Sequence, residues 1–438
     1  MSKFMFVVIA LALTGEFLAE MGLPRVFRFS TELSAAVLSF CIVVLAAKRG
    51  FVPVRPAYWI MFLLIGLHLL FGIVANEVQL GTVIISARYY LGIMPFFVLP
   101  LVVPPTERDL KIQFGLIVCL GLIQLPFALQ QRMATIAVGN LSGDNTIGTL
   151  MNSGLLSVFL ICLAAVVFTV YLRGKLRLAA TVPILLIILL PTMINETKGS
   201  LFLIPFAFFV PVLARPSTNL AKNLTVAAIS CAAFFALYVP IYNSFLESRS
   251  GGGIVEFLTS EDRLVYYLKK DAEVGTTGPV GRIDKLVLPI RVLGTDPVLI
   301  TLGLGMGAVT QSSLGPQYEG EYVSKYGDLV GGTISRLFWE IGWLGLVLVN
   351  VFLALIFLDS WKMRHRTDTT GLFAQAWVAV LAVMAVGMFY KNVMSSSAIS
   401  MLFWYYCGVV VANAAQGAQP QQLAQGERVN FNQVKGTG

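Results

Sequence analysis

Charge is scarce in this sequence, and that scarcity decides its class. Lys, Arg, Asp and Glu make up 12% of the 438 residues, whereas hydrophobic residues make up 57%. Soluble domains carry about 25% charged residues, so the composition excludes an ordinary soluble protein and indicates a polytopic membrane protein. The net charge of +8 does not indicate nucleic-acid binding, because membrane proteins concentrate Lys and Arg in their cytoplasmic loops.

Histidine and cysteine are also few, which limits the available chemistry. The two histidines are His68, in an apolar run, and His365, in a basic loop. A His-based metal site or a His-dependent triad therefore has almost nothing to be built from. The five cysteines lie in apolar segments without metal-ligand spacing and are interpreted as small buried hydrophobic residues. We expect no metal site and no cofactor.

Long apolar runs, in contrast, are abundant. A membrane-spanning helix needs roughly 20 apolar residues, and this rule predicts an all-α membrane protein with about twelve transmembrane helices. The predicted spans lie near 4–21, 32–48, 57–76, 81–103, 110–131, 149–172, 177–194, 198–214, 222–242, 336–358, 371–390 and 394–414. The predicted division of the chain is 1–242 (spans one to nine), 243–335 (a large loop), 336–414 (the last three spans) and 415–438 (a disordered tail).

The distribution of basic residues predicts the orientation. With the N-terminus inside, the cytoplasmic loops and tails hold 16 Lys and Arg residues, and the short loops on the opposite side hold 5. Because Lys and Arg accumulate on the cytoplasmic side, both termini are predicted to be cytoplasmic. The 243–335 loop is then outside, which in a bacterium is the periplasmic face of the inner membrane.

The 243–335 loop concentrates the charge that the rest of the chain excludes. It holds 8 Lys/Arg and 11 Asp/Glu, or 19 of the chain's 54 charged residues, so we expect the chemistry beside it. Within the loop, 254–272 and 282–293 place apolar residues at three- and four-residue spacings. This pattern predicts amphipathic helices lying on the bilayer surface, with Pro289 kinking or ending the second one.

Ionisable side chains in or beside apolar spans are expensive and are therefore candidate functional residues. Several cations that converge at one membrane face, without metal ligands, would suit a diphosphate. Guanidinium groups bind phosphate oxygens bidentately, and Lys acts as a point charge. In the predicted topology six candidates lie in the outer half: Arg88, Lys198, Arg282, Arg336, Glu340 and Lys391.

Structural roles remain open for several of these residues. Lys198 and Lys391 lie at helix ends, where lysine side chains commonly extend to the interface. Arg88 has a possible structural partner in Glu16 or Glu20, which would hold helices together. The functional and structural interpretations differ in whether these cations face a shared site.

The remaining candidates have alternatives of the same kind. Arg336 fits a helix-end charge with Glu340 as its partner at i+4. Arg263 and Arg291 are candidate substrate-binding residues, although the solvated face of a surface helix also accounts for them. The GLGMG run at 303–307 lacks the strand, turn, helix and lysine of a phosphate loop and is interpreted as a glycine-dependent turn or close helix contact.

Three stretches of the chain resemble the Wzy-type polysaccharide polymerase and O-antigen ligase-like superfamily of bacterial membrane proteins. TKGSLFL at 197–203 is similar to that family's Ser-Arg-Gly stretch, with Lys198 in place of the arginine. Gly281-Arg282, followed by an apolar run and GLGMG, is similar to its arginine helix and glycine-rich turn. SRLFWEIGWLGLVL at 335–348 is similar to its helix after the loop, with Glu-x-Gly-x-x-Gly spacing from Glu340.

The resemblance implies a metal-independent membrane glycosyltransferase that acts on undecaprenyl-diphosphate-linked oligosaccharides at the periplasmic face. Donor and acceptor would both be lipid-linked, and a chain-length regulator and a flippase are the implied protein partners. Arg282, Lys198 and Arg88 would stabilise charge on the departing diphosphate. Asp328 and Glu196 are the candidates for orienting the acceptor hydroxyl.

One departure from the family pattern favours the polymerase branch. Ligases of this superfamily have a His-Asn pair several residues before the Glu-x-Gly helix, but this chain has Gly331-Gly332 there and no histidine in the loop. Two alternatives stay open: a ligase that transfers glycan to another acceptor, and a lipid-linked glycan transporter or flippase. A transporter would place its charges near the bilayer midplane in matched halves of the chain.

Overall fold

The computed structural model is helical throughout the residues that it describes, which are 2–139, 143–150, 152–216, 219–246, 254–262, 265, 281–312, 315–326 and 330–434. The helices before the large loop are α1 (Ser2–Glu20), η1 (Arg25–Phe29), α2 (Ser30–Arg49), α3 (Pro56–Ala75), α4 (Leu80–Tyr90), α5 (Met94–Val102), α6 (Glu107–Ala137), η2 (Gly143–Asn145), α7 (Ser153–Leu172), α8 (Leu178–Ile194), α9 (Gly199–Leu213) and α10 (Leu220–Leu246). They are followed by α11 (Ile254–Thr259), α13 (Asp284–Leu293), α14 (Pro297–Leu302), η3 (Pro316–Tyr318), α15 (Val323–Tyr326), α16 (Thr333–Met363), α17 (Thr369–Tyr390), η5 (Val393–Ser395) and α18 (Ser397–Val434).

Eight described helices are long and apolar enough to cross a membrane, which agrees with a polytopic membrane protein. Each of the twelve predicted spans is helical, but four of them are not among these eight helices. The first forms α1, which does not meet this standard. The fourth is broken into α4 and α5, which meet at 45°, and the seventh and eighth form the shorter helices α8 and α9. The count of twelve spans therefore stays a prediction.

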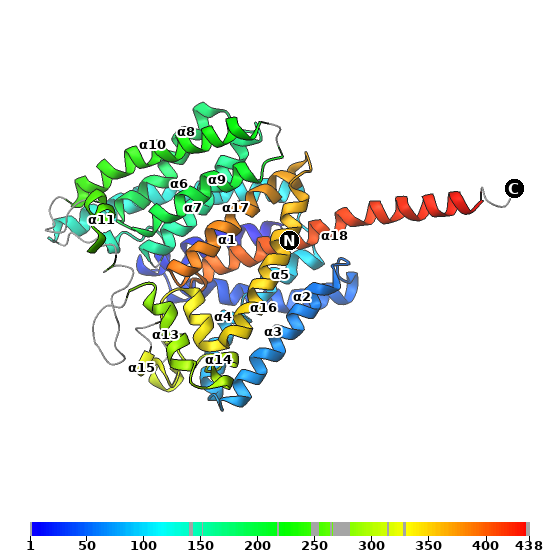
Figure 1. Ribbon diagram of the computed structural model, residues 1–438, viewed down its shortest axis with the longest axis horizontal. Coiled ribbons are helices and arrows are strands. Elements are labelled where there is room, and N and C mark those ends of the chain that lie inside the picture. The colour runs from blue at the N-terminus through cyan, green and yellow to red at the C-terminus, as the bar shows by residue number, and fades with distance from the viewer. Residues whose placement is uncertain are drawn as a thin grey trace.

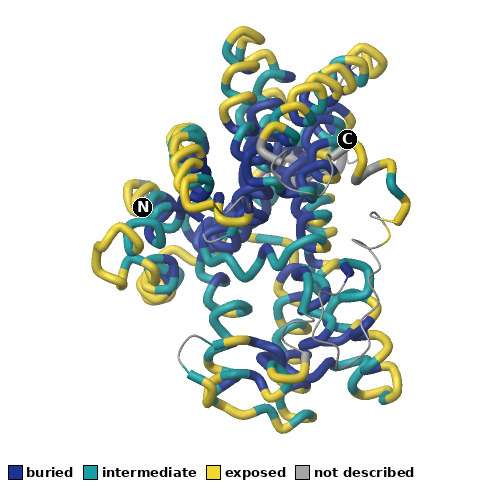
Figure 2. Tube along the Cα trace, turned by 90° about the vertical axis from the view of Figure 1, so that its left-hand side faces the viewer, coloured by how far each residue is buried: buried dark blue, intermediate teal, exposed yellow. Residues whose placement is uncertain are grey.

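The buried centre of the bundle consists of α7, α17 and the first part of α18. Their membrane-length windows are 72–83% buried, whereas those of α2, α3 and α10 are 22–28% buried. Figure 2 shows the buried segments in the interior and exposed turns around them. The inner helices are apolar on all sides, as expected for helices surrounded by other helices. The prediction of buried cysteines is wrong for Cys119, which is exposed on α6.

The described part of the 243–335 loop packs on the bundle at one end (Figure 1). Helix α13 is amphipathic, and its buried Leu288 and Leu293 contact a small apolar cluster that includes Trp339 of α16. Leu288 and Leu293 are therefore covered by protein, whereas Val287 and Ile290 are exposed. The position of this helix on the bilayer surface stays a prediction. The helix also continues through Pro289 to Leu293.

Helix α18 runs on beyond the predicted span and projects from the body of the molecule (Figure 1). The sequence predicts disorder after about residue 415, yet the helix extends to Val434. Ala and Gln are good helix formers, which favours continuation of a helix already started by the buried part of α18. An isolated helical extension is only marginally stable in water, so its interpretation as a separate tail stays a prediction.

Candidate functional site

A break in α16 organises the candidate site. Gly342 has φ 63° and ψ −172° inside the helix, a left-handed conformation that favours glycine. The GLGMG turn packs against this break, and Gly303, Gly305 and Gly307 all have positive φ between 74° and 98°. A Cβ on Gly303 would lie 2.5 Å from the Glu340 carbonyl carbon and the Gly342 nitrogen. The run is therefore a close backbone contact, as the sequence predicted.

The break frees three backbone carbonyls, and three separate donors satisfy them. Leu304 N donates to Trp339 O at 2.8 Å, and Gly305 N donates to Glu340 O at 3.0 Å. His68 Nε2 lies 2.7 Å from Ile341 O, and because a carbonyl only accepts, this nitrogen carries the proton. His68 thus has a structural role, and unpaired carbonyls are avoided at the kink.

Glu340 is fully buried at the end of the first segment of α16 and holds a network together. Tyr90 donates to Glu340 Oε2 at 2.5 Å, and Thr310 donates to Glu340 Oε1 at 2.6 Å. Arg336 donates to Thr310 Oγ1 at 2.5 Å, and its Nε lies 3.6 Å from Glu340 Oε2. The i+4 partnership proposed from the sequence is present, and the charge of Arg336 is largely neutralised by Glu340.

Tyr89 connects this network to Arg88. The guanidinium of Arg336 lies 4.3 Å from the Tyr89 ring centroid, and that of Arg88 lies 4.7 Å from it. Arg88 also donates from Nη2 to the Tyr89 hydroxyl at 2.6 Å. Cations near an aromatic face are attracted by its quadrupole, so Tyr89 positions both guanidinium groups.

Arg88 forms no ion pair with a carboxylate in the described part of the chain. The structural alternative was a pair with Glu16 or Glu20, but Glu16 pairs with Arg28 at 3.1 Å instead. The Nε atom of Arg88 is buried without a hydrogen-bond acceptor among the described residues. A partly buried guanidinium in this state is expensive and is a candidate anion ligand.

A polar cavity of about 410 Å³ lies beside Arg88. It is bounded by α1, the start of α2, the start of α7 and the segment from α17 to α18. Arg88 and Lys391 line it together, although they are 303 positions apart in the sequence. Asn152, Asn392 and three serines supply further hydrogen-bonding groups: Ser395, Ser396 and Ser397. The lining also includes Arg28 and two carboxylates, Glu16 and Glu32. The cavity therefore combines three cations and two carboxylates with neutral polar groups, and Glu16 is the carboxylate paired with Arg28.

Arg282 belongs to the same region through Tyr390 and Lys391. Its guanidinium lies 5.1 Å from the ring centroid of Tyr390. Tyr390 is the last residue of α17 and directly precedes Lys391. Burial lowers the pKa of Lys391, the positive charge of Arg282 lowers it further, and the carboxylate of Asp144 raises it. These effects place Arg282, Lys391 and Asp144 within electrostatic reach of one another, with two cations for one anion.

Glu196 lies close to this region but already has a strong partner. Arg132 of α6, which is fully buried, approaches Glu196 Oε1 with Nη2 at 2.6 Å. Glu196 occupies the turn between α8 and α9 with φ 56°, an uncommon conformation for a non-glycine residue. Gly143 packs against Asn195 and Glu196, which brings the turn beside Asp144.

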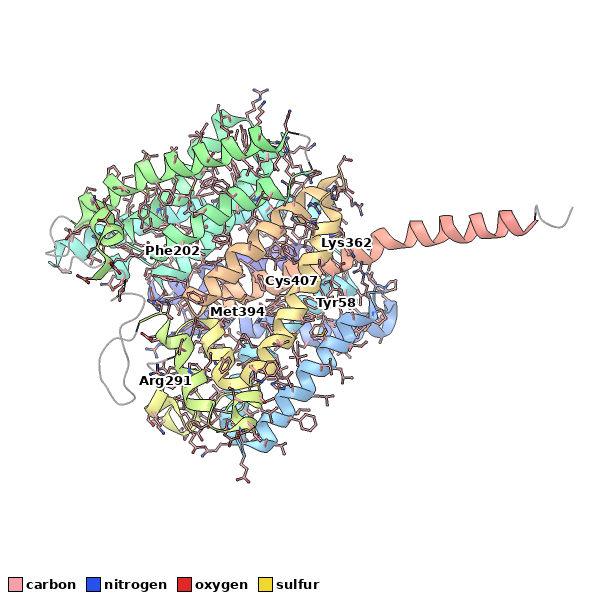
Figure 3. All side chains as sticks on the ribbon, viewed as in Figure 1. Tyr58, Phe202, Arg291, Lys362, Met394 and Cys407 are labelled. Atoms are coloured by element: carbon pink, nitrogen blue, oxygen red, sulfur yellow. The ribbon has the colours of Figure 1, made fainter. Side chains whose placement is uncertain are left out.

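An apolar cavity of about 150 Å³ adjoins the polar one. Tyr89 and Asn392 line both cavities. The rest of its wall is almost entirely apolar and comes from α3, α16 and α18, with Arg336 at one point of the lining. Met394, which is labelled in Figure 3, is part of that wall. The polar cavity and the apolar cavity thus adjoin each other at Tyr89.

The other predicted site residues lie apart or outside the described residues. Arg291 is exposed on α13, at the end of the molecule away from Lys362 (Figure 3). Lys198 is the residue before α9, next to Gly199, which packs against the Tyr390 ring. Asp328 and Arg263 lie outside the described residues, so their predicted roles are not addressed by the structure.

Sequence reasoning missed Tyr89, Tyr90, Thr310 and Arg132. The tyrosines and Thr310 are uncharged and resemble ordinary interfacial residues, so nothing in the pattern set them apart. Arg132 had a usable signal, because α6 buries polar residues at helical spacing along one face: Gln113, Gln124, Arg132 and Thr135. A polar face on an apolar helix indicates a polar interior rather than a loop.

No model of a known protein family matches the chain, and no curated relative matches it.

Proposed function

We propose that this protein joins lipid-linked oligosaccharides into a cell-surface polysaccharide at the periplasmic face of the bacterial inner membrane. The donor is a growing glycan on undecaprenyl diphosphate, and the acceptor is a lipid-linked repeat unit. The observation that carries the proposal is Arg88, a partly buried guanidinium without a carboxylate partner among the described residues, which lines the polar cavity with Lys391.

The polar cavity holds more cationic than anionic side chains, with Arg28, Arg88 and Lys391 against Glu16 and Glu32. Arg88 and Lys391 line it, and Arg282 lies beside Lys391. Cations fixed before the reaction stabilise charge that develops on a leaving group, and they do so more effectively in a site shielded from water. The adjoining apolar cavity gives the first isoprene units of the lipid a place next to that charge.

The proposed reaction needs little covalent chemistry from the protein. The acceptor hydroxyl oxygen bonds to the anomeric carbon of the donor sugar while the bond from that carbon to the diphosphate oxygen breaks. The electron pair leaves with the lipid diphosphate, and the hydroxyl proton passes to a base or to water. Glu196, held by Arg132 at 2.6 Å, is the described carboxylate that we propose orients the acceptor.

The proposed topology keeps the sequence-based orientation. Both termini are cytoplasmic, about twelve helices cross the membrane, and the 243–335 loop is periplasmic. The separation of Arg291 from Lys362 along the bundle (Figure 3) supports this assignment, because Lys362 lies in the last turn of α16, next to the basic loop that leads to α17. A chain-length regulator and a flippase are the proposed protein partners.

The test is polymer formation in a deletion strain complemented with Arg88→Ala, Arg88→Lys or the control Arg291→Ala. Membrane levels of each variant are matched by immunoblotting. We expect Arg88→Ala to abolish polymer while single lipid-linked repeats accumulate in the periplasm, Arg88→Lys to keep part of the activity, and Arg291→Ala to act as wild type. Normal polymer with Arg88→Ala would refute the assigned site.

A transporter remains the second candidate because of the broken helices. The break in α16 and the 45° bend between α4 and α5 resemble the discontinuous helices that form transporter sites. The same assay separates the two functions, since loss of a flippase leaves the lipid-linked repeats on the cytoplasmic side. A ligase would give a third outcome, in which polymer forms but is not attached to its acceptor.

A further inference from the structure

Three cavities meet at the break between α4 and α5. The first is the polar cavity described above. The second is the apolar cavity described above, which we name the α3–α16 cavity. The third has a volume of about 380 Å³ and lies between α2 and the break. We name it the α2 cavity. Its lining is mostly apolar and includes Ala35, Ala36, Leu91, Ile93 and Pro95.

The two apolar cavities are separated by backbone. Leu91 and Ile93 line both of them, and these residues belong to the segment that connects α4 to α5. The segment is also anchored at each side, since Leu91 N donates to Ala87 O at 2.6 Å and α5 packs on α2 and α18. A hydrocarbon chain in one cavity therefore does not share volume with a chain in the other.

Each apolar cavity has its own connection to the polar cavity. Tyr89 and Asn392 lie at the junction with the α3–α16 cavity. Arg88, Glu32 and Ser397 lie at the junction with the α2 cavity. The polar cavity thus adjoins both apolar cavities, one at Tyr89 and the other at Arg88.

We propose that the two apolar cavities hold the first isoprene units of two lipid diphosphates at the same time, with both headgroups directed to the polar cavity. This inference rests on the proposed function and specifies how its two substrates are held. Charge complementarity selects the occupant. Once Arg28 is paired with Glu16, Arg88 and Lys391 outnumber Glu32 in the lining and favour an anionic headgroup where both apolar cavities reach the polar cavity.

Two substrate sites with separate tails have a mechanistic consequence. Reacting groups held together in a defined geometry react as one complex, which removes most of the entropic cost of an encounter. The growing chain can then remain in one cavity while repeat units enter the other. The backbone wall formed by Leu91 and Ile93 prevents the two lipids from exchanging places within the site.

The cavities can be filled separately. A Cβ on Gly66, which lines the α3–α16 cavity, would meet no atom within 4 Å, so Gly66→Leu occupies free volume. Ala36→Trp places an indole in the wall of the α2 cavity. Two matched controls are Gly115→Leu on α6, where a Cβ also meets nothing within 4 Å, and Val37→Trp, an exposed neighbour on α2.

The experiment is native mass spectrometry of the purified protein with undecaprenyl diphosphate, which carries no sugar. We expect two bound lipids on the wild type and on both controls, and one on Gly66→Leu and on Ala36→Trp. A single lipid on the wild type, or two on both filled variants, would overturn the proposal. Equal binding of phosphatidylglycerol would also overturn it, because the cavities would then be general phospholipid sites.

This measurement is independent of glycosyl transfer. If Arg88→Ala leaves polymer formation normal but two lipids still bind, the proposed function fails and the two-site proposal survives as a property of the protein. If polymer formation depends on Arg88 but only one lipid binds to the wild type, the two-site proposal fails and the proposed function survives. Free diphosphate, added as competitor, identifies how much of the binding comes from the headgroup alone.

Discussion

Removal of the Glu340 carboxylate is the perturbation with the clearest expected cost. Glu340→Ala leaves the Arg336 guanidinium buried without its charge partner and leaves the Tyr90 hydroxyl without its acceptor. The structure places Glu340 at 0% exposure and Arg336 at 9%. Almost no solvent is therefore in reach of the carboxylate to replace the lost interactions.

The magnitude follows from these two losses. Leaving one member of a buried ion pair uncompensated costs about 3–5 kcal/mol, and an unsatisfied buried hydroxyl costs about 1–3 kcal/mol. Arg336 also lines the α3–α16 cavity, where water can partly hydrate it. We therefore expect a loss at the lower end of the summed range, about 4 kcal/mol.

The assay is a double-mutant cycle on unfolding of the detergent-solubilised protein, followed by intrinsic fluorescence. It compares Glu340→Ala, Arg336→Ala and the double variant. Because each single variant breaks the same pair, the double variant should be much less destabilised than the sum, with a coupling energy of roughly 1–3 kcal/mol. Additive effects, or a stable Glu340→Ala protein, would refute the assignment of this network as a buried ion pair.

Two further predictions concern the break in α16 and the charge of the polar cavity. Gly342→Ala should lower the midpoint of thermal unfolding, because a left-handed conformation costs a non-glycine residue about 1–2 kcal/mol and the new Cβ would meet Gly303 N at 2.6 Å. Gly115→Ala is the unstrained control. Equal unfolding midpoints for the two variants would contradict the role given to the break. For Lys391, burial first and Arg282 second lower the pKa from 10.5, so the folded protein releases this proton more readily than the unfolded chain does. As the pH rises through the lowered pKa, stability should therefore increase while the affinity for undecaprenyl diphosphate falls; Lys391→Arg should move the loss of affinity to higher pH, and an unchanged binding profile would argue against Lys391 as a ligand.

The helical architecture could be predicted from the sequence because each transmembrane helix requires a long apolar run. Every predicted span is helical, including the tight pair around 177–214. The breaks could not be predicted in the same way. Gly92 and Gly342 lie within predicted spans, and a glycine alone does not mark a break, because glycine is common in transmembrane helices. A helix breaks at such a glycine only where other segments supply hydrogen-bond donors for the carbonyls that the break leaves unpaired.

The candidate site was partly predictable for a related reason. Arg88 and Lys391 are charges where apolar residues are expected, so each could be identified alone. Both residues line the same cavity because of how α4, α7 and α17 pack, and this packing cannot be read from any local sequence pattern. Tyr90 and Thr310 carry no charge, and their importance comes entirely from Glu340, to which they donate at 2.5 Å and 2.6 Å.

The break at Gly342 also imposes an order on the assembly of the chain. The carbonyls of residues 339–341 accept hydrogen bonds from Leu304, Gly305 and His68, which belong to two other parts of the sequence. Until those donors are in place, an unbroken α16 is the state that satisfies its own backbone in lipid. We therefore expect α16 to enter the membrane as a continuous helix and to bend only when the preceding loop docks. The hydrogen-bond network of Glu340 is then completed only when that loop docks, because Thr310 belongs to the loop.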